Sequence, residues 1–330
     1  MTFFSFIIPV YNRPDELSEL LESICNLQGT DFEVIVVEDG STNLSEDICL
    51  KFRHQLSIQY IFQTNLGPGL ARNKGAQSAA GDWLIFLDSD TILPTNYLSN
   101  LKKELETCDF DCFGGPDKAH QSFNAVQKAI GYSMTNILTT GGIRGGDEKM
   151  DKFYPRSYNL GVKKTVFLQL GGFSEMRFGE DLDFSMRLLE NGYKTRLLKD
   201  VFLFHKRRNN FVSFFKQVFN SGIARINLGI RHPQTIKLVH WFPAFFVVGH
   251  FFIAVLSILY PILLILLSLA PIILFFDSLL YNKSLKISFL TVVASFVQIF
   301  GYGLGFLKAF ILRKILKKRE FHSFKKNFYK

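Results

Sequence analysis

Acidic residues are nearly absent after residue 200 of this 330-residue chain. No Asp or Glu occurs between Asp200 and Asp277, and the only acid after Asp277 is Glu320. Cysteine is also scarce, and the four cysteines have no metal-binding or redox spacing, which favours a reducing compartment. The N-terminus has neither the basic region nor the small-residue cleavage site of a secretory signal, so we expect the first half to stay in the cytosol. With 48% hydrophobic and 20% charged residues, the chain is not disordered, collagen-like or a disulfide scaffold.

Positive charge is concentrated in two segments of the second half. Residues 1–205 carry 27 acids and 20 bases, whereas residues 206–231 carry six bases and no acid. Residues 308–330 carry nine bases and one acid, which supplies +8 of the formal net charge of +9. A basic surface of this kind suits an anionic partner, either nucleic acid or lipid headgroups. The apolar runs beside these segments favour lipid, and we expect no nucleic-acid partner.

Two long apolar runs separate the basic segments. Residues 241–281 consist almost only of Phe, Ile, Leu and Val up to Asp277. As a helix this run would be about 60 Å long, twice the roughly 30 Å hydrocarbon core of a bilayer. Residues 287–307 would form a helix of about 31 Å, the length of one crossing. A buried hairpin in a soluble protein is the alternative, but core helices rarely run so long without a polar face, so we predict membrane insertion.

The length of the apolar runs and the charge of the C-terminal tail give conflicting predictions of the number of membrane crossings. If residues 241–281 form two spans that turn near Tyr260 and Pro261, three crossings place the basic tail outside, which the positive-inside rule opposes. If one segment is re-entrant, the tail returns to the cytosolic side. We expect a hairpin and a cytosolic tail, with one segment that does not cross fully. The preceding residues 206–238 alternate basic and aromatic side chains, and we expect an amphipathic helix in the interface.

The first 90 residues alternate strand-like and helix-like patterns. Strands are predicted at residues 3–10, 32–37, 56–62 and 83–87, with helices over residues 14–24 and 66–80. Strands separated by helices of this length predict a parallel α/β sheet, in which ligands bind beyond the carboxyl ends of the strands.

Polar clusters follow three of the predicted strands, at residues 11–13, 38–41 and 88–90. Any one of them could be an ordinary turn, because Asp, Asn, Gly and Ser dominate turns. Asp88 and Asp90, however, come directly after a buried strand and could present oxygens to a hard divalent cation. The helix predicted over residues 66–80 begins with a Gly-containing segment, from Gly67 to Arg72. The free backbone N–H groups at such a helix start favour binding of an anion.

These motifs, in their order along the chain, resemble glycosyltransferase family 2. The matching stretches are IIPVYNR (7–13), VIVVEDGS (34–41), Asn65 to Gly75, LDSD (87–90), NLG (159–161), LGGF (170–173) and GEDLDF (179–184). The resemblance spans about residues 3–205. It implies the GT-A fold, an α/β fold with a Rossmann-like mixed sheet, which a C-terminal α-helical membrane region would follow here.

The resemblance implies a donor site at the strand ends. Asp39 would hydrogen-bond the base of a nucleotide-diphosphate sugar, and Asp88 would lie near the ribose and the metal. The other donor-binding residues would be Pro9, Tyr11, Arg13, Gly40, Asn65, Gly67 and Arg72. Asp88 and Asp90 would hold a divalent cation, Mg²⁺ or Mn²⁺, that neutralises the diphosphate. His205 would complete the metal site; the alternative is an interfacial histidine beside Lys206.

The resemblance also implies the catalytic residues. Asp181 would be the general base that takes the proton of the attacking sugar hydroxyl, with inversion at the anomeric carbon; such help is typically worth about 10²–10⁴-fold. Glu180 is the alternative base. Both acids also suit a helix N-terminus, where they offset the dipole. The acceptor side would be formed by Gly171, Gly172 and Phe173.

The chain departs from the family pattern in two places. Processive polysaccharide synthases of the family carry Gln-x-x-Arg-Trp after the catalytic domain, and neither Gln217 nor Gln234 is followed by Arg-Trp. We therefore expect transfer of a single sugar. Glu38 stands where the family usually has Asp, which should matter little if Asp39 contacts the base. The Gly-rich residues 141–146 are predicted to form a loop over the site.

Together these features predict a metal-dependent, inverting glycosyltransferase in the inner or plasma membrane, multi-pass, with a cytoplasmic catalytic domain. It would move one sugar from a nucleotide-sugar donor to a lipid-linked or nascent glycan acceptor in envelope or exopolysaccharide assembly. The expected regions are a catalytic domain (1–205), an interfacial helix (206–238), two or three transmembrane helices (239–308) and a basic tail (309–330). Alternatives are a non-catalytic assembly partner and a membrane-tethered oxidoreductase, which would need Gly-x-Gly-x-x-Gly where the chain has Tyr11-Asn12-Arg13-Pro14.

Overall fold

The chain forms two compact units, seen in a computed structural model that describes residues 2–118, 120, 123–140, 153–206 and 208–323. The first unit comprises Met1–His120 and Gly146–Lys206, and the second comprises Gln121–Gly145 and Arg207–Lys330. Residues 121–145 thus belong with the helical second unit. Our division of the chain by function stays a prediction, and the Gly-rich residues 141–146 lie outside the described residues.

The first unit is built on a seven-stranded mixed sheet in the order β3-β2-β1-β4-β8-β6-β9. The four strands from β3 to β4 are mutually parallel, β8 runs antiparallel to both of its neighbours, and β9 is parallel to β6. The strands are β1 (Phe4–Val10), β2 (Phe32–Asp39), β3 (Ile58–Gln63), β4 (Trp83–Leu87), β6 (Cys112–Gly114), β8 (Asn159–Lys163) and β9 (Thr195–Leu197). The strands and helices predicted for residues 3–90 are confirmed, with ends that shift by at most a few residues.

Helices cover both faces of this sheet, because alternate residues of the buried strands point to opposite sides. Phe6 and Ile8 join the core under one face, whereas Ile7 and Val37 join the core under the other. The first face is covered by α1 (Pro14–Cys25), α2 (Glu46–Phe52) and α4 (Tyr97–Thr107), and the second by α3 (Pro68–Ser78), α7 (Lys164–Gln169) and α8 (Glu180–Glu190). The strand ends therefore remain as the place where polar side chains gather.

A small second sheet lies beyond the end of β4. It has the order β5-β10-β7 and consists of β5 (Thr91–Ile92), β10 (Leu203–His205) and β7 (Asp117–Lys118). The pairing places His205 opposite Thr91, directly after the Asp88–Asp90 turn. This sheet therefore brings His205 close to the Asp88–Asp90 turn, although the two are far apart in the chain.

The second unit is a helical assembly in which α9 and α12 pack side by side along their lengths. Its elements are α5 (Ala125–Thr135), α6 (Ile137–Thr140), α9 (Phe211–Arg231), α10 (Phe242–Leu256), α11 (Leu264–Asn282) and α12 (Leu285–Ala309), with a π-helical turn at Phe310–Ile315. Glycines permit the close approach: a Cβ at Gly305 would lie 2.0 Å from the carbonyl oxygen of Phe219, and one at Gly222 would lie 2.2 Å from that of Tyr302.

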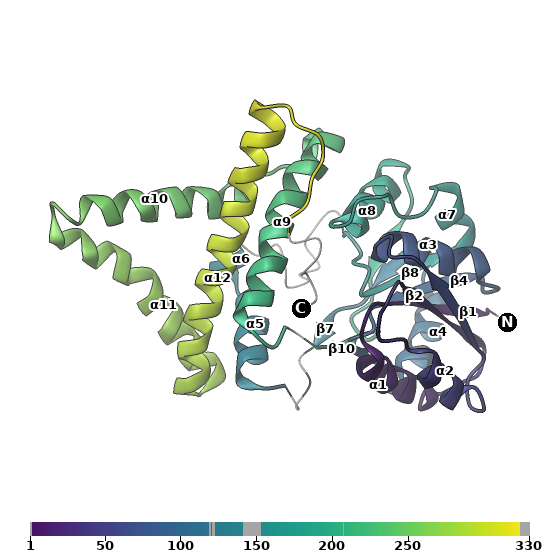
Figure 1. The fold of residues 1–330 in the computed structure, drawn as a ribbon. Helices are drawn as coiled ribbons and strands as arrows, with labels where there is room; N and C mark the ends of the chain where they lie inside the picture. The colour runs from purple at the N-terminus through teal and green to yellow at the C-terminus, as the bar shows by residue number, and fades with distance from the viewer. Residues whose placement is uncertain (1, 119, 121–122, 141–152, 207, 324–330) are drawn as a thin grey trace. The chain divides into compact units, whose positions relative to one another are not determined.

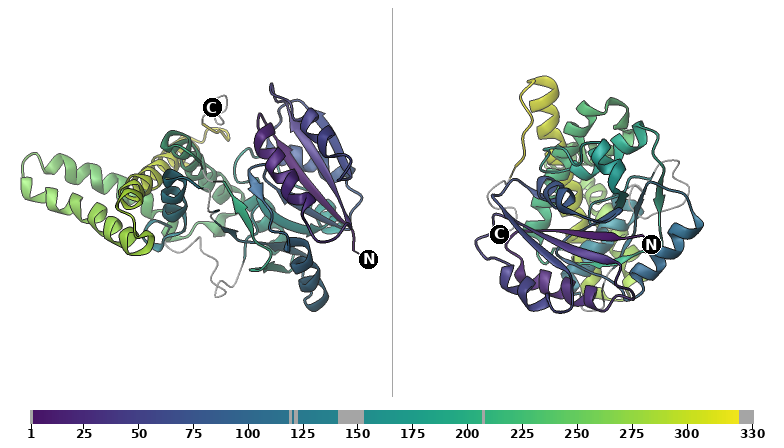
Figure 2. Two further views of the ribbon diagram at one scale, coloured as in Figure 1. Left: turned by 90° about the horizontal axis from the view of Figure 1, so that it is seen from below. Right: turned by 90° about the vertical axis from the view of Figure 1, so that its right-hand side faces the viewer.

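Helices α10 and α11 form a hairpin that projects from this pair (Figure 2). The turn between them contains the short 3₁₀ helix Pro261–Leu263, so the predicted reversal near Tyr260 is confirmed. Among the described residues, two segments could span a membrane by length and composition, Pro261–Asn282 and Leu285–Ile315. The apolar helix α10 is shorter.

Candidate active site

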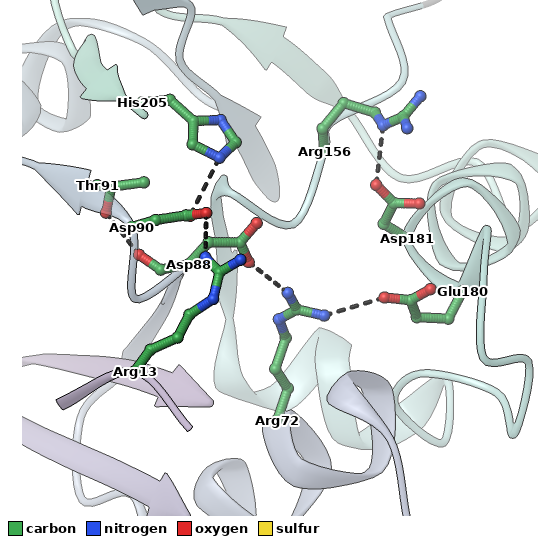
Figure 3. A network of polar contacts seen from close by, with 9 residues as sticks. All are labelled: Arg13, Arg72, Asp88, Asp90, Thr91, Arg156, Glu180, Asp181 and His205. Atoms are coloured by element: carbon green, nitrogen blue, oxygen red, sulfur yellow. Dashed lines mark hydrogen bonds and ion pairs between the residues drawn. The ribbon is translucent and has the colours of Figure 1, made fainter. Parts of the chain in front are cut away.

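Three potential metal ligands converge where β4 and β10 end. Asp88 and Asp90 follow β4, and His205 ends β10. One ligand atom from each of them lies within 4.8 Å of the others, and His205 Nε2 lies 3.2 Å from Asp90 Oδ1 (Figure 3). The hydroxyl of Thr91 donates to the carbonyl oxygen of Asp88 at 2.7 Å and fixes the turn. The three residues predicted to hold a metal are therefore brought together.

The donor set fits a divalent cation. Two carboxylates and one imidazole are ligands that Mn²⁺ and Mg²⁺ sites accept. The other ring nitrogen of His205 lies 3.6 Å from Asp117 Oδ2, and metal-bound histidines commonly face a carboxylate on that side. The sequence did not single out Asp117, because the pairing of β7 with β10 that positions it involves residues far apart in the chain.

Two arginines hold the carboxylates of this cluster. Arg13, just after β1, forms an ion pair with Asp90. Arg72, on α3, donates to Asp88 Oδ1 at 2.5 Å and to Glu180 Oε1 at 3.0 Å. Arg72 is buried, so this bridge is a fixed part of the site rather than a surface ion pair. Arg72 is therefore not a solvated residue on the surface of α3.

The two predicted catalytic acids begin α8. Gly179 precedes them with a φ of +85°, a backbone conformation that favours glycine, and turns the chain into the helix. Glu180 and Asp181 are both buried despite their charge. Asp181 Oδ2 accepts from Arg156 Nε at 2.8 Å, and its Oδ1 accepts from the backbone N–H of Leu182. Arg156 is a further site residue that the sequence analysis missed.

The environments of the paired acids separate their pKa values. Burial, together with the negative charge of Asp181, raises the pKa of Glu180 from 4.5 to about 7. Burial acts on Asp181 in the same direction, but the Arg156 guanidinium, the Leu182 N–H and the charge of Arg72 together outweigh it and hold the pKa of Asp181 below its usual range. At neutral pH, Asp181 is therefore an ionised carboxylate, whereas Glu180 is partly protonated.

Asp39, at the end of β2, organises a second part of the same sheet edge. Its carboxylate accepts from the backbone N–H groups of Leu66 and Gly67, both at 2.9 Å, and from the Gln63 side chain at 2.8 Å. These donors occupy three of its roughly four acceptor positions. Asn65 donates to the Asp39 carbonyl oxygen, so the segment that leads into α3 is tied to the end of β2.

Other residues at this edge act through the backbone. Gly40 has a φ of +73°, and a Cβ there would lie 2.5 Å from the backbone nitrogen of Asn65. Pro9 and Tyr11 lie at and just beyond the end of β1, and both are partly exposed. Glu38 is buried, and its carboxylate accepts from the backbone N–H of Ser45 at 2.7 Å. Its side chain therefore anchors a loop and is not directed at the candidate metal ligands.

The predicted acceptor-side residues form a tight turn against α3. Gly171 and Gly172 both have positive φ, and Asn73 exchanges two hydrogen bonds of 2.8 Å with the backbone of Phe173. Phe173 is only 2% exposed and packs in the core, so its ring offers no surface to an acceptor. The structure brings this turn close to the site, but it places Phe173 as a support. Arg187 of α8 donates to the Gly172 carbonyl oxygen at 2.7 Å.

Comparison with solved structures identifies the class of fold. A mannosyltransferase from Pyrobaculum calidifontis, solved with GDP-Man and Mn²⁺, has the same fold with a TM-score of 0.65 and 16% identity, over 90% of this chain and 87% of that one. The TarS protein of Staphylococcus aureus in complex with UDP-GlcNAc gives a TM-score of 0.50 at 22% identity, over 68% of this chain and 67% of that one. The predicted GT-A fold is confirmed.

Sequence comparison then gives the family. The models "Glycosyl transferase family 2" and "Glycosyl transferase family group 2" match residues 5–158 and 83–280. An uncharacterized glycosyltransferase of Haemophilus influenzae is 31% identical over 219 residues, 62% of this chain and 70% of that protein. The glycosyltransferase GlyA of Streptococcus pneumoniae is 38% identical over 149 residues, 45% of this chain but only 20% of that protein. The chain belongs to glycosyltransferase family 2 and is an enzyme of that family.

Proposed function

We propose that this enzyme transfers one sugar from a nucleotide-diphosphate donor to a hydroxyl acceptor, with inversion and with a divalent cation. The observation that carries the proposal is the clustering of Asp88, Asp90 and His205 beside the acids of α8, with Arg72 joining the two groups. The nucleotide sugars bound to the two structural neighbours support the donor class.

Asp88, Asp90 and His205 would hold Mg²⁺ or Mn²⁺, which supplies positive charge to the diphosphate leaving group. Arg13 pairs with Asp90 and Arg72 with Asp88, so both carboxylates are already oriented toward the same space. Asp39, with one acceptor position left by Gln63, Leu66 and Gly67, would receive a hydrogen bond from the nucleotide base. Pro9, Tyr11, Gly40 and Asn65 would shape that end of the donor site.

Asp181 is the proposed general base. The acceptor oxygen attacks the anomeric carbon, its proton passes to the Asp181 carboxylate, and the bond to the phosphate oxygen breaks with its electron pair leaving on the diphosphate. The Arg156 contact at 2.8 Å keeps Asp181 ionised and fixes its orientation. Glu180 is a second candidate, because a base with a pKa near the working pH is favourable and that of Glu180 is raised to about 7.

We further propose that the acceptor is lipid-linked or a nascent glycan, in envelope or exopolysaccharide assembly on the cytoplasmic side of the membrane. The apolar, basic second unit supports a lipid surface nearby. TarS of Staphylococcus aureus, named a poly(ribitol-phosphate) beta-N-acetylglucosaminyltransferase, is 39% identical over 94 residues, 16% of its length.

The test is release of nucleoside diphosphate by the purified full chain. A panel of UDP- and GDP-sugars is offered with Mn²⁺, with Mg²⁺ or with a chelator, and the anomeric configuration of the product is determined by NMR. We expect metal-dependent release from one donor, at least 100-fold slower in Asp181→Asn. Glu190→Gln, at the other end of α8, is the matched control. Equal release by wild type and Asp181→Asn would refute the assignment of this base.

A further inference from the structure

The hairpin of α10 and α11 has an apolar tip that the other described residues leave almost uncovered. Ile258 is 80% exposed and Leu259 is 73% exposed at the turn, and Ile262 follows with 69%. Only 11% of the apolar window in α11 is buried, which is not the pattern of a helix in a soluble core. An apolar projection of this kind needs a partner that is itself apolar.

The reach of the hairpin limits how deep its tip can go. α10 starts directly against α12, because a Cβ at Gly303 would lie 2.5 Å from the carbonyl oxygen of Pro243. Tyr260 follows Pro243 by 17 residues, which is at most about 26 Å of helix. The hydrocarbon core is about 30 Å thick. If α12 lies at one surface of the bilayer, the tip ends inside the hydrocarbon.

The composition of the hairpin agrees with a buried tip. Residues 238–276 contain no Asp, Glu, Lys or Arg, and the nearest charged residues, Lys237 and Asp277, lie at the two feet. A turn that emerged on the far side would lie in water or among headgroups, where polar residues are expected. At its own foot, the Asp277 carboxylate is hydrogen-bonded by the Tyr132 hydroxyl and by Asn136 at 2.8 Å.

The C-terminal segment argues against a bilayer crossing by α9 and α12. After the π-helical turn the chain folds back along α9, where Asn220 donates to the Ser323 carbonyl oxygen at 2.9 Å and accepts from the Ser323 N–H at 3.0 Å. Arg313 donates to Asn227 at 3.0 Å. Non-helical backbone with basic side chains cannot face lipid hydrocarbon, so the middle of α9 must lie in the interface. The α9–α12 pair then lies along the membrane surface.

The distribution of charge is consistent with this arrangement. Lysines and arginines occur on α9, at both feet of the hairpin, at both ends of α12 and in the segment after α12. They are Lys216, Arg225, Arg231, Lys237, Lys283, Lys286, Lys308, Arg313, Lys314, Lys317, Lys318 and Arg319. With α9 and α12 in the interface, all of these charges share one side of the membrane, where they attract anionic headgroups.

We propose that the second unit is a one-sided membrane anchor: the hairpin enters the hydrocarbon from the face on which α9 and α12 lie and returns to that face. The occupant of its apolar surface is lipid acyl chain. The chain then places no described segment on the far side of the membrane, which resolves the conflict between the length of the apolar run and the positive tail.

Cysteine accessibility in the full chain tests this arrangement. Cys25 and Cys108 are replaced by Ser, and the buried Cys49 and Cys112 are kept. Single cysteines are placed at exposed positions of the feet (Leu238→Cys, Leu285→Cys) and of the tip (Ile258→Cys, Ile262→Cys). A membrane-impermeant maleimide is applied to right-side-out and to inverted vesicles. We expect both feet to react in the same kind of vesicle and the tip to react only after detergent.

A bimane label at Ile262→Cys then identifies what covers the tip. We expect quenching by lipids that carry a doxyl group on the acyl chain and none by aqueous iodide. Tip labelling in either kind of vesicle, or feet that react in opposite kinds, would overturn the proposal in favour of full crossings or of no insertion. Failure of doxyl lipid to quench would also overturn it, because a second copy or another protein would then cover the tip.

Discussion

Arg72 joins the two acidic groups of the site, with one guanidinium nitrogen 2.5 Å from Asp88 and another 3.0 Å from Glu180. Asp88 follows β4, whereas Glu180 begins α8, 108 residues after Arg72. A single buried cation therefore keeps the proposed metal ligands and the proposed base at a fixed separation. The separation of these two acidic groups therefore depends on how α3, which carries Arg72, packs against the sheet.

The buried bridge predicts a large cost for removing its cation. Arg72→Met leaves Asp88 and Glu180 close together without a counter-charge, so we expect a loss of about 3–5 kcal/mol in the free energy of unfolding. Arg72→Lys keeps the charge but cannot contact both carboxylates in the same way, so it should recover part of the stability and little of the activity. Thermal unfolding in detergent and nucleoside diphosphate release measure the two effects. If Arg72→Met unfolds at the same temperature as the wild-type protein, the predicted loss of stability is wrong.

The proposed metal site predicts that Asp90 contributes to cation affinity. Asp90 lies 3.2 Å from His205 and offers a carboxylate oxygen to the proposed cation, so we expect Asp90→Asn to raise the Mn²⁺ concentration for half-saturation at least about tenfold. Asp109→Asn, at an exposed surface position, is the control. Binding of Mn²⁺ is followed by electron paramagnetic resonance with and without donor. If Mn²⁺ binds equally well to Asp90→Asn and to the wild-type protein, Asp90 is not a ligand of the cation.

The raised pKa of Glu180 predicts a pH dependence of stability. The folded state binds the Glu180 proton more tightly than the unfolded state does, since the pKa rises from 4.5 to about 7. This contribution is fully present below about pH 4.5 and is lost as the pH rises toward 7. Glu180→Gln should therefore lose less stability than wild type between pH 5 and pH 7. Melting temperatures over this range test the sign, with Glu190→Gln as the control.

The same variant separates the two candidate bases. If Asp181 is the base, Glu180→Gln keeps the acidic limb of the pH–rate profile, which then reflects the lowered pKa of Asp181. If Glu180 is the base, its limb near pH 7 disappears together with most of the activity. The profile of kcat/KM for both single variants decides between them.

Close packing of α9 on α12 predicts a steric effect at Gly305. A Cβ there would lie 2.0 Å from the Phe219 carbonyl oxygen, so Gly305→Ala must push the helices apart, and we expect a loss of about 1–3 kcal/mol in stability. Gly249→Ala is the matched control, because a Cβ at Gly249 meets nothing within 4 Å. Detergent-solubilised protein is compared by thermal unfolding. Equal melting temperatures for the two variants would show that the helices do not pack this closely.

The sequence alone determined the sheet edge at which the acids collect. Short β-branched runs alternate with helical repeats, and parallel strands joined in this way place their carboxyl ends together, so Asp39 and Asp88 could be assigned to one edge before the structure was known. The hairpin turn near Pro261 followed from length and hydrophobicity. These are local patterns, or consequences of a general rule of topology.

Tertiary structure alone decided which charges meet. Arg156 contacts Asp181, Asp117 faces His205, and Asn220 holds the segment that returns after α12, and each pair is separated by 25 residues or more. No periodicity encodes such a pair, because it depends on how helices and strands distant in the chain pack together. The pKa values of Glu180 and Asp181 differ for the same reason: adjacent in sequence, they face different cations in the folded protein.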